Sequence, residues 1–231
     1  MNIQHHGAVN GVTGSCHQLH INNHNSVLID CGLFQGAEKR AEKGYHTKHT
    51  NTEHTSIENN EAQLAIDFDI STVQALIVTH CHIDHVGRIP YLLSAGFRGA
   101  IYATQATAAL LPLVIEDALK VGVTRNKTII AACIKRLKQQ LVPLPYKQWQ
   151  AITLTSATTN NTHTSVNIKF QMAGHILGSA YIEVEIINNK ANKSKTKHRV
   201  VFSGDLGAPY APLLPAPQSP YRADTLVIES T

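Results

Sequence analysis

The sequence has little of what would place it in several common protein classes. Aromatic residues make up only 6% of the 231 residues, so we expect no stacking platform for nucleic-acid bases. No apolar run approaches the roughly eighteen residues that a membrane-spanning helix needs. The N-terminal stretch MNIQHHGAVNG lacks the basic and apolar segments of a signal peptide. These absences predict a protein without membrane association.

Cysteine is also scarce, and its spacing excludes two familiar kinds of site. The four cysteines are Cys16, Cys31, Cys81 and Cys133. They form no C-x-x-C pair and no framework of disulfides. Such a set is typical of a reducing compartment, so we expect a cytoplasmic protein.

Charged residues are few, and the Lys and Arg residues are spread along the chain. Charged residues make up 16% of the sequence and apolar residues 43%, a composition that is typical of folded domains rather than disordered chains. The net charge of +4 suits a polyanionic partner but does not require one. A chain of 231 residues is long enough to bury a sizeable core.

Apolar patterning predicts strands and helices in the first part of the chain. CHQLHIN and SVLIDCG are expected to pair as a hairpin across the Asn-rich turn INNHNS. ALIVT at 75–79 is typical of a strand that is buried on both faces, and AIYAT at 100–104 is the next strand. Helices are expected over 86–95, 105–120 and 126–140, and Pro112 should break or kink the second of them.

The second part is expected to be rich in strands. These are SVNIKFQMA, AYIEVEII, HRVVFSGD and, after a proline-rich irregular segment, TLVIE at 225–229 as one more buried strand. The polar stretch at 38–63 is expected to be an exposed loop. The basic residues between 190 and 199 are more typical of a solvated loop than of a phosphate site.

Histidine is the exception in this plain composition, with fourteen residues. Three of them lie within six positions of the stretch IVTHCHIDHVGR, directly after a buried strand. Residues i and i+2 of an extended chain point to the same side, so His80 and His82 can reach one metal ion. Asp84 and His85 follow where the chain turns into a helix, and they can address a second position. Cys81 should point away from both histidines.

Three further candidates lie at turns or strand ends. His175 lies in AGHILGSA, Asp205 in VVFSGDLG and Asp30 in VLIDCG. Singly, each is more typical of a structural turn residue. Together with the histidine cluster they favour a hydrolytic centre with two zinc ions roughly 3.5–4 Å apart. Asp30 is either a ligand or a partner that fixes the orientation of a histidine.

This order of motifs resembles the metallo-β-lactamase fold. GAVNGVTGSCH, LIDCGLFQG, THCHIDHVGRIPYL, AGHILGSA and FSGDLG resemble, more narrowly, the β-CASP branch of RNA-processing nucleases. That branch contains the cleavage and polyadenylation endonuclease and its bacterial relatives. The resemblance implies an α/β fold, an αββα sandwich of which this chain holds the N-terminal portion. It places a metallo-β-lactamase domain at 1–225 and the start of a β-CASP domain at 226–231.

The resemblance also implies roles for individual residues. His80, His82 and His175 would hold one zinc ion, Asp84 and His85 a second, and Asp205 would bridge both. Asp30 would orient a ligand, and Glu229 matches the acidic residue of the family at the start of the next domain. Asp84, Asp205, Asp30 and Glu229 are therefore the implied catalytic residues. The implied reaction is metal-assisted attack of water on the RNA backbone, which leaves a 5′-phosphate and a 3′-hydroxyl.

Family members are longer than this chain, and the additional part supplies a histidine of the second zinc site. We therefore expect a portion of a longer protein, with an incomplete second site. Core-facing apolar surface would then be exposed, which favours self-association, for example as a homodimer.

Two other interpretations remain open at this point. One is a hydrolase of a small thioester, lactam or ester on the same fold, which explains the metal motif but not the matches at 11–36 and 206–231. The other is a module that binds zinc or RNA without catalysis. A flavodiiron redox protein is disfavoured, because that group resembles H-x-E-x-D-H where this chain has His82. The RNA target and the choice between endonuclease and exonuclease action are not encoded in these patterns.

Overall fold

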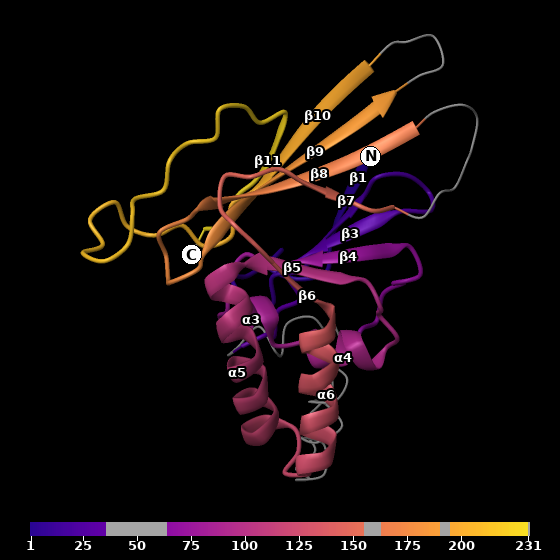
Figure 1. Cartoon of the computed structure of the whole chain (residues 1–231), viewed down its shortest axis with the longest axis vertical. Coiled ribbons are helices and arrows are strands. Elements are labelled where there is room, and N and C mark those ends of the chain that lie inside the picture. Colours follow the sequence, from indigo (N-terminus) through magenta and orange to yellow (C-terminus); the bar gives the residue numbers. More distant parts are fainter. Residues whose placement is uncertain (36–63, 155–162, 190–194, 231) are drawn as a thin grey trace, which may run out of the picture.

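Two β-sheets and one layer of helices are stacked face to face in the computed structural model, which describes residues 1–35, 64–154, 163–189 and 195–230 (Figure 1). The six-stranded sheet has the order β1-β2-β3-β4-β5-β6 and the five-stranded sheet the order β11-β10-β9-β8-β7. In the first sheet β1, β2 and β3 are antiparallel, and β3 to β6 are parallel. In the second sheet only β10 and β11 are parallel.

The strands and helices have the following bounds. The first sheet contains β1 (Asn2–His5), β2 (His17–His20), β3 (Ser26–Ile29), β4 (Val73–Ile77), β5 (Ala100–Thr104) and β6 (Leu141–Leu144). The second contains β7 (Gln150–Ile152), β8 (His163–Met172), β9 (Ala180–Asn189), β10 (Lys195–Phe202) and β11 (Thr225–Val227). The helices are α3 (Ile83–Val86), α4 (Ile89–Ser94), α5 (Gln105–Gly122) and α6 (Lys127–Gln140).

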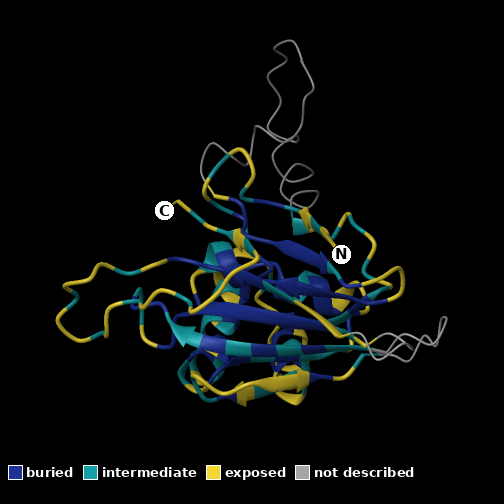
Figure 2. Ribbon diagram, turned by 90° about the horizontal axis from the view of Figure 1, so that it is seen from above, coloured by how far each residue is buried: buried dark blue, intermediate teal, exposed yellow. Residues whose placement is uncertain are grey.

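Alternation along the central strands divides the core in two. On β4, Leu76 faces the helices, whereas Ala75 and Ile77 face the second sheet, because successive side chains of a strand point to opposite faces. Both sets are fully buried, which agrees with the prediction that ALIVT is covered on both sides. Figure 2 shows buried residues concentrated in these stacked layers and exposed ones in the loops.

The predicted hairpin of β2 and β3 is confirmed by their antiparallel pairing. The predicted helix at 86–95 is partly wrong, because helical structure begins at Ile83 and is interrupted between α3 and α4. Arg88 explains the interruption: its backbone N–H donates to the carbonyl of Cys31, and its buried side chain donates to the carbonyl of Gly32 at 2.6 Å. These bonds draw the chain at Arg88 out of the regular helical pattern.

Pro112 does not break its helix, because α5 runs without interruption from Gln105 to Gly122, and the alternative of a kink stays a prediction. Proline removes one backbone hydrogen bond, yet Pro112 is itself buried and follows the fully buried Leu111. Packing of this face against the sheet stabilises the helix in spite of the missing bond.

Edge strands account for two other differences from the sequence prediction. The sequence analysis expects no strand directly after the helix that ends at 140, yet β6 adds an edge strand to the first sheet there and holds Pro143, whose missing N–H is tolerated at an edge. TLVIE is not a buried strand: β11 ends at Val227, and Leu226 is 54% exposed at the edge of the second sheet. β11 also spans the predicted domain boundary between 225 and 226, which stays a prediction.

The predicted loop at 38–63 lies outside the described residues. Within the described ranges, no helix is long and apolar enough to cross a membrane. The described helices all cover the first sheet, so the outer face of the second sheet is covered differently. There, the cationic groups of Lys169 and Arg199 lie over the ring of Trp149, 4.5 and 5.1 Å from its centre. Both also form ion pairs with Glu183, which is 1% exposed.

Candidate metal centre

Chemically active side chains from both sheets meet at one end of the strands. Asp30 follows β3, His80 follows β4 after a short extended segment, Asp205 follows β10, and Glu229 follows β11. His175 lies in the turn between β8 and β9. Because β3 and β4 are parallel, and β10 is parallel to β11, these strands deliver their carboxyl-terminal residues to the same edge.

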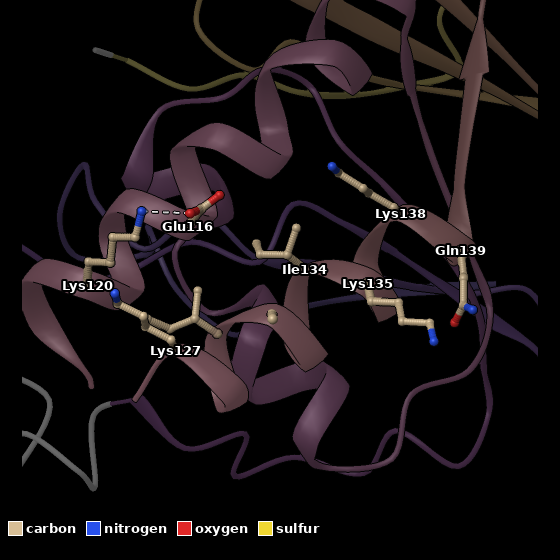
Figure 3. A pocket seen from close by; sticks show the side chains of 9 residues that line it. Glu116, Lys120, Lys127, Ile134, Lys135, Lys138 and Gln139 are labelled. Atoms are coloured by element: carbon tan, nitrogen blue, oxygen red, sulfur yellow. Dashed lines mark hydrogen bonds and ion pairs between the residues drawn. The ribbon is translucent and has the colours of Figure 1, made fainter. Parts of the chain in front are cut away.

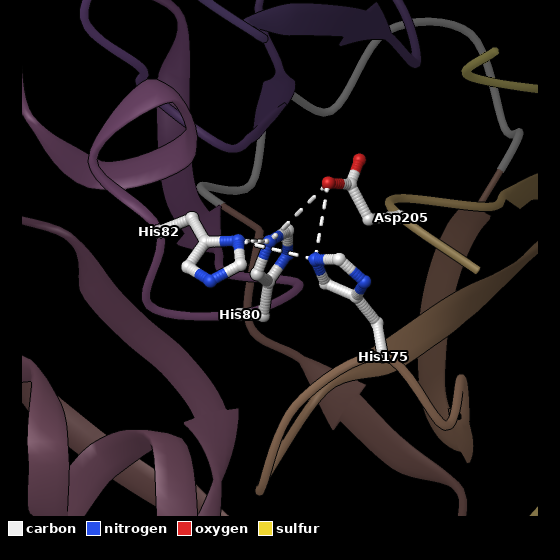
Figure 4. Close-up of side chains that lie close together, drawn as sticks. All are labelled: His80, His82, His175 and Asp205. Atoms are coloured by element: carbon white, nitrogen blue, oxygen red, sulfur yellow. Dashed lines mark hydrogen bonds and ion pairs between the residues drawn. The ribbon is translucent and has the colours of Figure 1, made fainter. Parts of the chain in front are cut away.

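A first group contains His80, His82, His175 and Asp205 (Figure 4). His82 Nδ1 lies 3.1 Å from His80 Nε2 and 3.1 Å from His175 Nε2. Asp205 Oδ2 lies 3.7 Å from His80 Nε2 and 3.3 Å from His175 Nε2. The predicted pairing of His80 with His82 is therefore present, and His175 joins them from 93 positions away.

The spacing of this group fits a zinc ion. Zinc binds imidazole nitrogen at about 2.0–2.1 Å, so tetrahedral coordination separates two such nitrogens by about 3.3 Å. The separations of 3.1 Å between the histidine nitrogens are close to that value. Three ring nitrogens and one carboxylate oxygen also form the kind of donor set that zinc prefers.

A second group contains Asp30, His85 and Glu229. His85 Nδ1 lies 2.8 Å from Asp30 Oδ2, while its Nε2 lies 3.3 Å from Asp205 Oδ1 and 3.8 Å from Glu229 Oε2. The Oδ2 atom of Asp205 thus lies near the first group and its Oδ1 atom near the second. A carboxylate in this position can bridge two metal ions.

Unsatisfied buried atoms mark the same place. Among the described residues, five buried side-chain nitrogen or oxygen atoms have no hydrogen-bond partner, and three of them are His85 Nε2, Asp205 Oδ1 and Glu229 Oε2. Leaving a buried polar atom without a partner is costly, so their convergence requires an explanation. A cation held between them would satisfy all three, and this donor set fits a second metal ion.

The acidic surroundings of the second group change the pKa values of its members. Burial opposes the charged form of His85, but the nearby carboxylates of Asp205 and Asp30 outweigh it and raise its pKa to about 11. Burial and the nearby charge of His85 lower the pKa of His80 to about 2. The site therefore attracts positive charge at His85 and keeps His80 neutral. A metal ligand must be neutral imidazole, so an ion at His85 would replace a proton.

Asp30 is fixed more firmly than any other acidic residue of the site. It is fully buried, and its carboxylate accepts from the backbone N–H of Thr79 at 2.7 Å and from the Thr79 hydroxyl at 2.7 Å. Its backbone has φ of 57°, a left-handed conformation that aspartate tolerates better than most residues. Burial raises the pKa of Asp30. Its contact with His85 is compatible with either predicted role, a ligand or a partner that orients a histidine, and the choice between them stays a prediction.

Two glycines allow the strand-end loops to approach one another. A β-carbon on Gly32 would lie 1.5 Å from the carbonyl oxygen of Asp84, and one on Gly207 would lie 1.8 Å from the carbonyl oxygen of Gly174. Backbone atoms cannot move aside as a flexible side chain can. Only glycine therefore lets the loop after β3 contact the turn before His85, and the loop after β10 contact the turn at His175.

The sequence analysis missed the residues that hold Glu229 in place. The hydroxyl of Ser15 donates to Glu229 Oε1 at 3.1 Å, and the backbone N–H of Glu229 donates to the hydroxyl of Ser203 at 2.9 Å. His17 Nε2 lies 3.7 Å from the same Oε1. Ser15 and Glu229 are 214 positions apart, so no local pattern could have linked them.

Asp84 is the one predicted ligand that belongs to neither group. It lies near enough for its charge to act on His175, and its role stays a prediction. Cys81 points away from the histidines, as expected, because its thiol donates to the carbonyl of Thr107 at 3.4 Å. Burial raises the pKa of this thiol to about 12.

Several known proteins are similar to this chain in sequence. Ribonuclease TTHA0252 of Thermus thermophilus is 34% identical over 231 residues, which are all of this chain and 44% of that protein. Transcription termination factor FttA of Cenarchaeum symbiosum is 30% identical over 89% of this chain and 27% of its own length. Endoribonuclease ysh-1 of Neurospora crassa is 32% identical over 71% of this chain and 18% of its own length. The chain thus spans less than half the length of these relatives.

The model of one protein family matches more than half of the chain. It is described as the metallo-beta-lactamase superfamily and covers residues 13–136, which include Asp30 and the histidine cluster of residues 80–85. The predicted resemblance to this fold is confirmed, and the relatives named as ribonucleases agree with the predicted branch. The chain belongs to the metallo-β-lactamase superfamily.

Proposed function

We propose that this chain hydrolyses phosphodiester bonds of RNA at a two-metal centre. The observation that carries the proposal is the position of Asp205, whose Oδ2 lies 3.3 Å from His175 Nε2 and whose Oδ1 lies 3.3 Å from His85 Nε2. A carboxylate between two ligand groups is typical of two-metal hydrolases. RNA as the substrate is supported by relatives named ribonuclease and endoribonuclease.

We assign the first metal position to His80, His82 and His175 and the second to His85, with Asp205 shared between them. Zinc is the proposed metal, because neutral imidazole and carboxylate are its usual ligands at hydrolytic sites. When bound, the two ions would lower the pKa of water and neutralise charge that develops on the phosphate.

The remaining acidic residues act on these ligands or on water. Asp30 is proposed to accept a hydrogen bond from the Nδ1–H of His85, which leaves the lone pair of Nε2 to face the second metal position. Glu229 Oε2 lies 3.8 Å from His85 Nε2 and is proposed to complete the second position. Asp84 is proposed to orient the attacking water, because it lies in the first turn of α3 and its charge acts on His175.

The domain bounds, the cellular location and the oligomeric state belong to the same proposal. Residues 1–225 are proposed as the metallo-β-lactamase domain and residues 226–231 as the start of a β-CASP domain. A cytoplasmic location is supported by the four cysteines, which are all free thiols. A homodimer is proposed as a form in solution.

The test is cleavage of a 5′-labelled, single-stranded RNA of twenty nucleotides by the purified chain after zinc loading. The expected result is products that carry a 5′-phosphate and a 3′-hydroxyl. Asp205→Asn should abolish cleavage, since it weakens both metal positions. His24→Ala removes an exposed histidine far from these ligands in the fold and should leave cleavage unchanged.

A chromogenic thioester and a chromogenic lactam, assayed in parallel, separate the proposal from its main alternative. Turnover of either compound without cleavage of RNA would favour a hydrolase of small molecules. A chain that binds two zinc ions and hydrolyses none of the three substrates would contradict the proposed activity.

A further inference from the structure

The hairpin of α5 and α6 carries a net charge equal to that of the whole chain. Residues 105–140 contain six Lys or Arg residues and two acidic residues, a net charge of +4, and the whole chain also has +4. The rest of the chain is therefore neutral on balance. Positive charge concentrated on one element is the electrostatic signature of a surface that binds a polyanion.

A groove runs along this hairpin between the two helices (Figure 3). Four lysines line it, Lys120 from α5 and Lys127, Lys135 and Lys138 from α6, and we call it the lysine groove. The α6 residues recur at helical spacing, so they project from one face of that helix. Figure 3 shows the lysines spread around Ile134.

Three of these ammonium groups are available for a ligand. Lys120 donates to Glu116 at 2.6 Å in an exposed pair on the same helix. Among the described residues, no carboxylate lies within ion-pair distance of Lys127, Lys135 or Lys138. Each of these three side chains is exposed.

The floor of the groove disfavours a hydrophobic protein partner. Ile130 and Ile134 are only 5% and 8% exposed, because they already pack into the core between the helices and the first sheet. A docking helix would therefore find little apolar surface to bury, whereas stable protein interfaces need a well-packed apolar centre. Lysine charge is the principal feature that a ligand could use.

We propose that the lysine groove binds the phosphate backbone of RNA at a place separate from the metal centre. Among the described residues no aromatic side chain lines the groove, so it would contact phosphates without reading bases. This inference rests on the proposed function, because it makes the groove a second contact for the same RNA.

Helix α5 connects the two places. At its start, the hydroxyl of Thr107 donates to the carbonyl of Gly178 at 2.9 Å, in the turn that carries His175. Glu116 lies nine residues further on, a rise of about 14 Å along the helix axis. An RNA strand of a few nucleotides is long enough to cover this distance, so the groove can hold the segment beside the one at the metal centre.

The experiment measures RNA binding separately from cleavage, by fluorescence anisotropy with a labelled twenty-nucleotide RNA at several salt concentrations. The background is Asp205→Asn, in which the RNA should stay intact. Adding Lys127→Gln, Lys135→Gln and Lys138→Gln should weaken binding about tenfold or more at low salt. The slope of log K against log salt should fall by about two, since each phosphate contact on a single strand contributes about 0.7.

The matched control carries the same change of charge elsewhere. Lys147→Gln, Lys195→Gln and Lys197→Gln also remove three exposed lysines and should weaken binding less than threefold. Equal losses in both triple variants would overturn the proposal, because they would indicate general attraction to a cationic protein. An acidic amphipathic peptide that displaces the RNA and binds more tightly than a scrambled peptide would also overturn it, in favour of a protein partner.

Failure of this proposal and failure of the proposed function are distinguishable. A chain that cleaves RNA with unchanged affinity in the groove variant has the proposed activity but no contact at the groove. A chain that binds RNA through the groove without cleaving it retains the contact and lacks the activity. Circular dichroism of both triple variants confirms that the helices are intact.

Discussion

At the scale of single residues, the site depends on polar groups that are buried and held in one orientation. Asp30 receives two hydrogen bonds from Thr79 and contacts His85 at 2.8 Å without exposure to solvent. Buried polar groups of this kind stabilise a structure only while every partner is present. The residue therefore links the stability of the fold to the orientation of a proposed metal ligand.

Replacement of Asp30 by alanine should destabilise the protein by about 3 kcal/mol or more, because it leaves His85 and Thr79 without their buried partner. Asp30→Asn should cost less, since the amide oxygen can still accept one of these bonds. Urea unfolding monitored by circular dichroism measures both values. Asp117→Ala, at an exposed position of α5, is the control and should change stability by less than about 0.5 kcal/mol. Equal stability of the Asp30→Ala variant and the native protein would show that the contact is dispensable.

The serines that hold Glu229 provide a second test at this scale. Ser15→Ala and Ser203→Ala each remove one hydrogen bond to Glu229 while its carboxylate remains. We expect the affinity for the weaker of two zinc ions to fall about tenfold or more, as is usual when a group that orients a ligand is lost. Isothermal titration with zinc measures this, and Ser94→Ala at an exposed site should leave both affinities unchanged. Unchanged zinc affinity in both serine variants would show that the hydrogen bonds that hold Glu229 have no effect on metal binding.

At the scale of elements, α5 and α6 illustrate how differently two helices are stabilised. α5 contains Pro112, and its continuity depends on packing against the first sheet. Both helices begin at a local cap: the hydroxyl of Thr104 accepts from the backbone N–H of Thr107 at 3.2 Å before α5, and the side chain of Asn126 accepts from the N–H groups of Thr128 at 3.0 Å and Ile129 at 3.3 Å before α6. Of the two, only α5 contains a proline, so its continuity depends on tertiary contacts in addition to its cap.

Replacing the cap at Asn126 with alanine should lower stability by about 1 kcal/mol, because two backbone N–H groups lose their acceptor. Asn126→Ser keeps an acceptor at the same place and should restore most of the loss. Midpoints of urea unfolding give both values. If alanine and serine were equally destabilising, the cap would have no part in the effect.

At the scale of the whole molecule, the two sheets come together at the proposed metal positions. His80, His82 and His85 come from the first sheet and its helices, whereas His175, Asp205 and Glu229 come from the second. A metal ion bound between them would join the two layers as well as serve the reaction. Binding to the folded state alone stabilises that state by mass action.

Zinc titration should therefore raise the melting temperature as well as reach a ratio near two ions per chain. With one site and free zinc at a hundred times its dissociation constant, the stabilisation is about 2.7 kcal/mol. His82→Ala should lower the ratio towards one, because it removes a ligand of the first group only. Calorimetry and elemental analysis measure the two quantities. A ratio of one in the native chain would contradict the bridging position proposed for Asp205.

Local patterns predicted the parts of this architecture that depend on neighbouring residues. The hairpin of β2 and β3, the buried strand β4, and helices α5 and α6 follow from apolar periodicity and turn residues. Local patterns did not predict the edge strands or the interruption at Arg88, because these features depend on contacts with residues that are distant in the sequence. β6, for example, contains Pro143 and reads as a strand only when β5 lies beside it.

The sequence by itself determined the family and the cluster of candidate ligands at residues 80–85. The spacing of His80, His82 and His85 after a buried strand fixes their directions through the geometry of the local backbone. Only the tertiary structure decided how the second group is arranged, because Glu229 meets Ser15 and His85 across most of the chain. It also decided that Asp205 faces both groups. Those contacts arise from the packing of two sheets, which no run of neighbouring residues records.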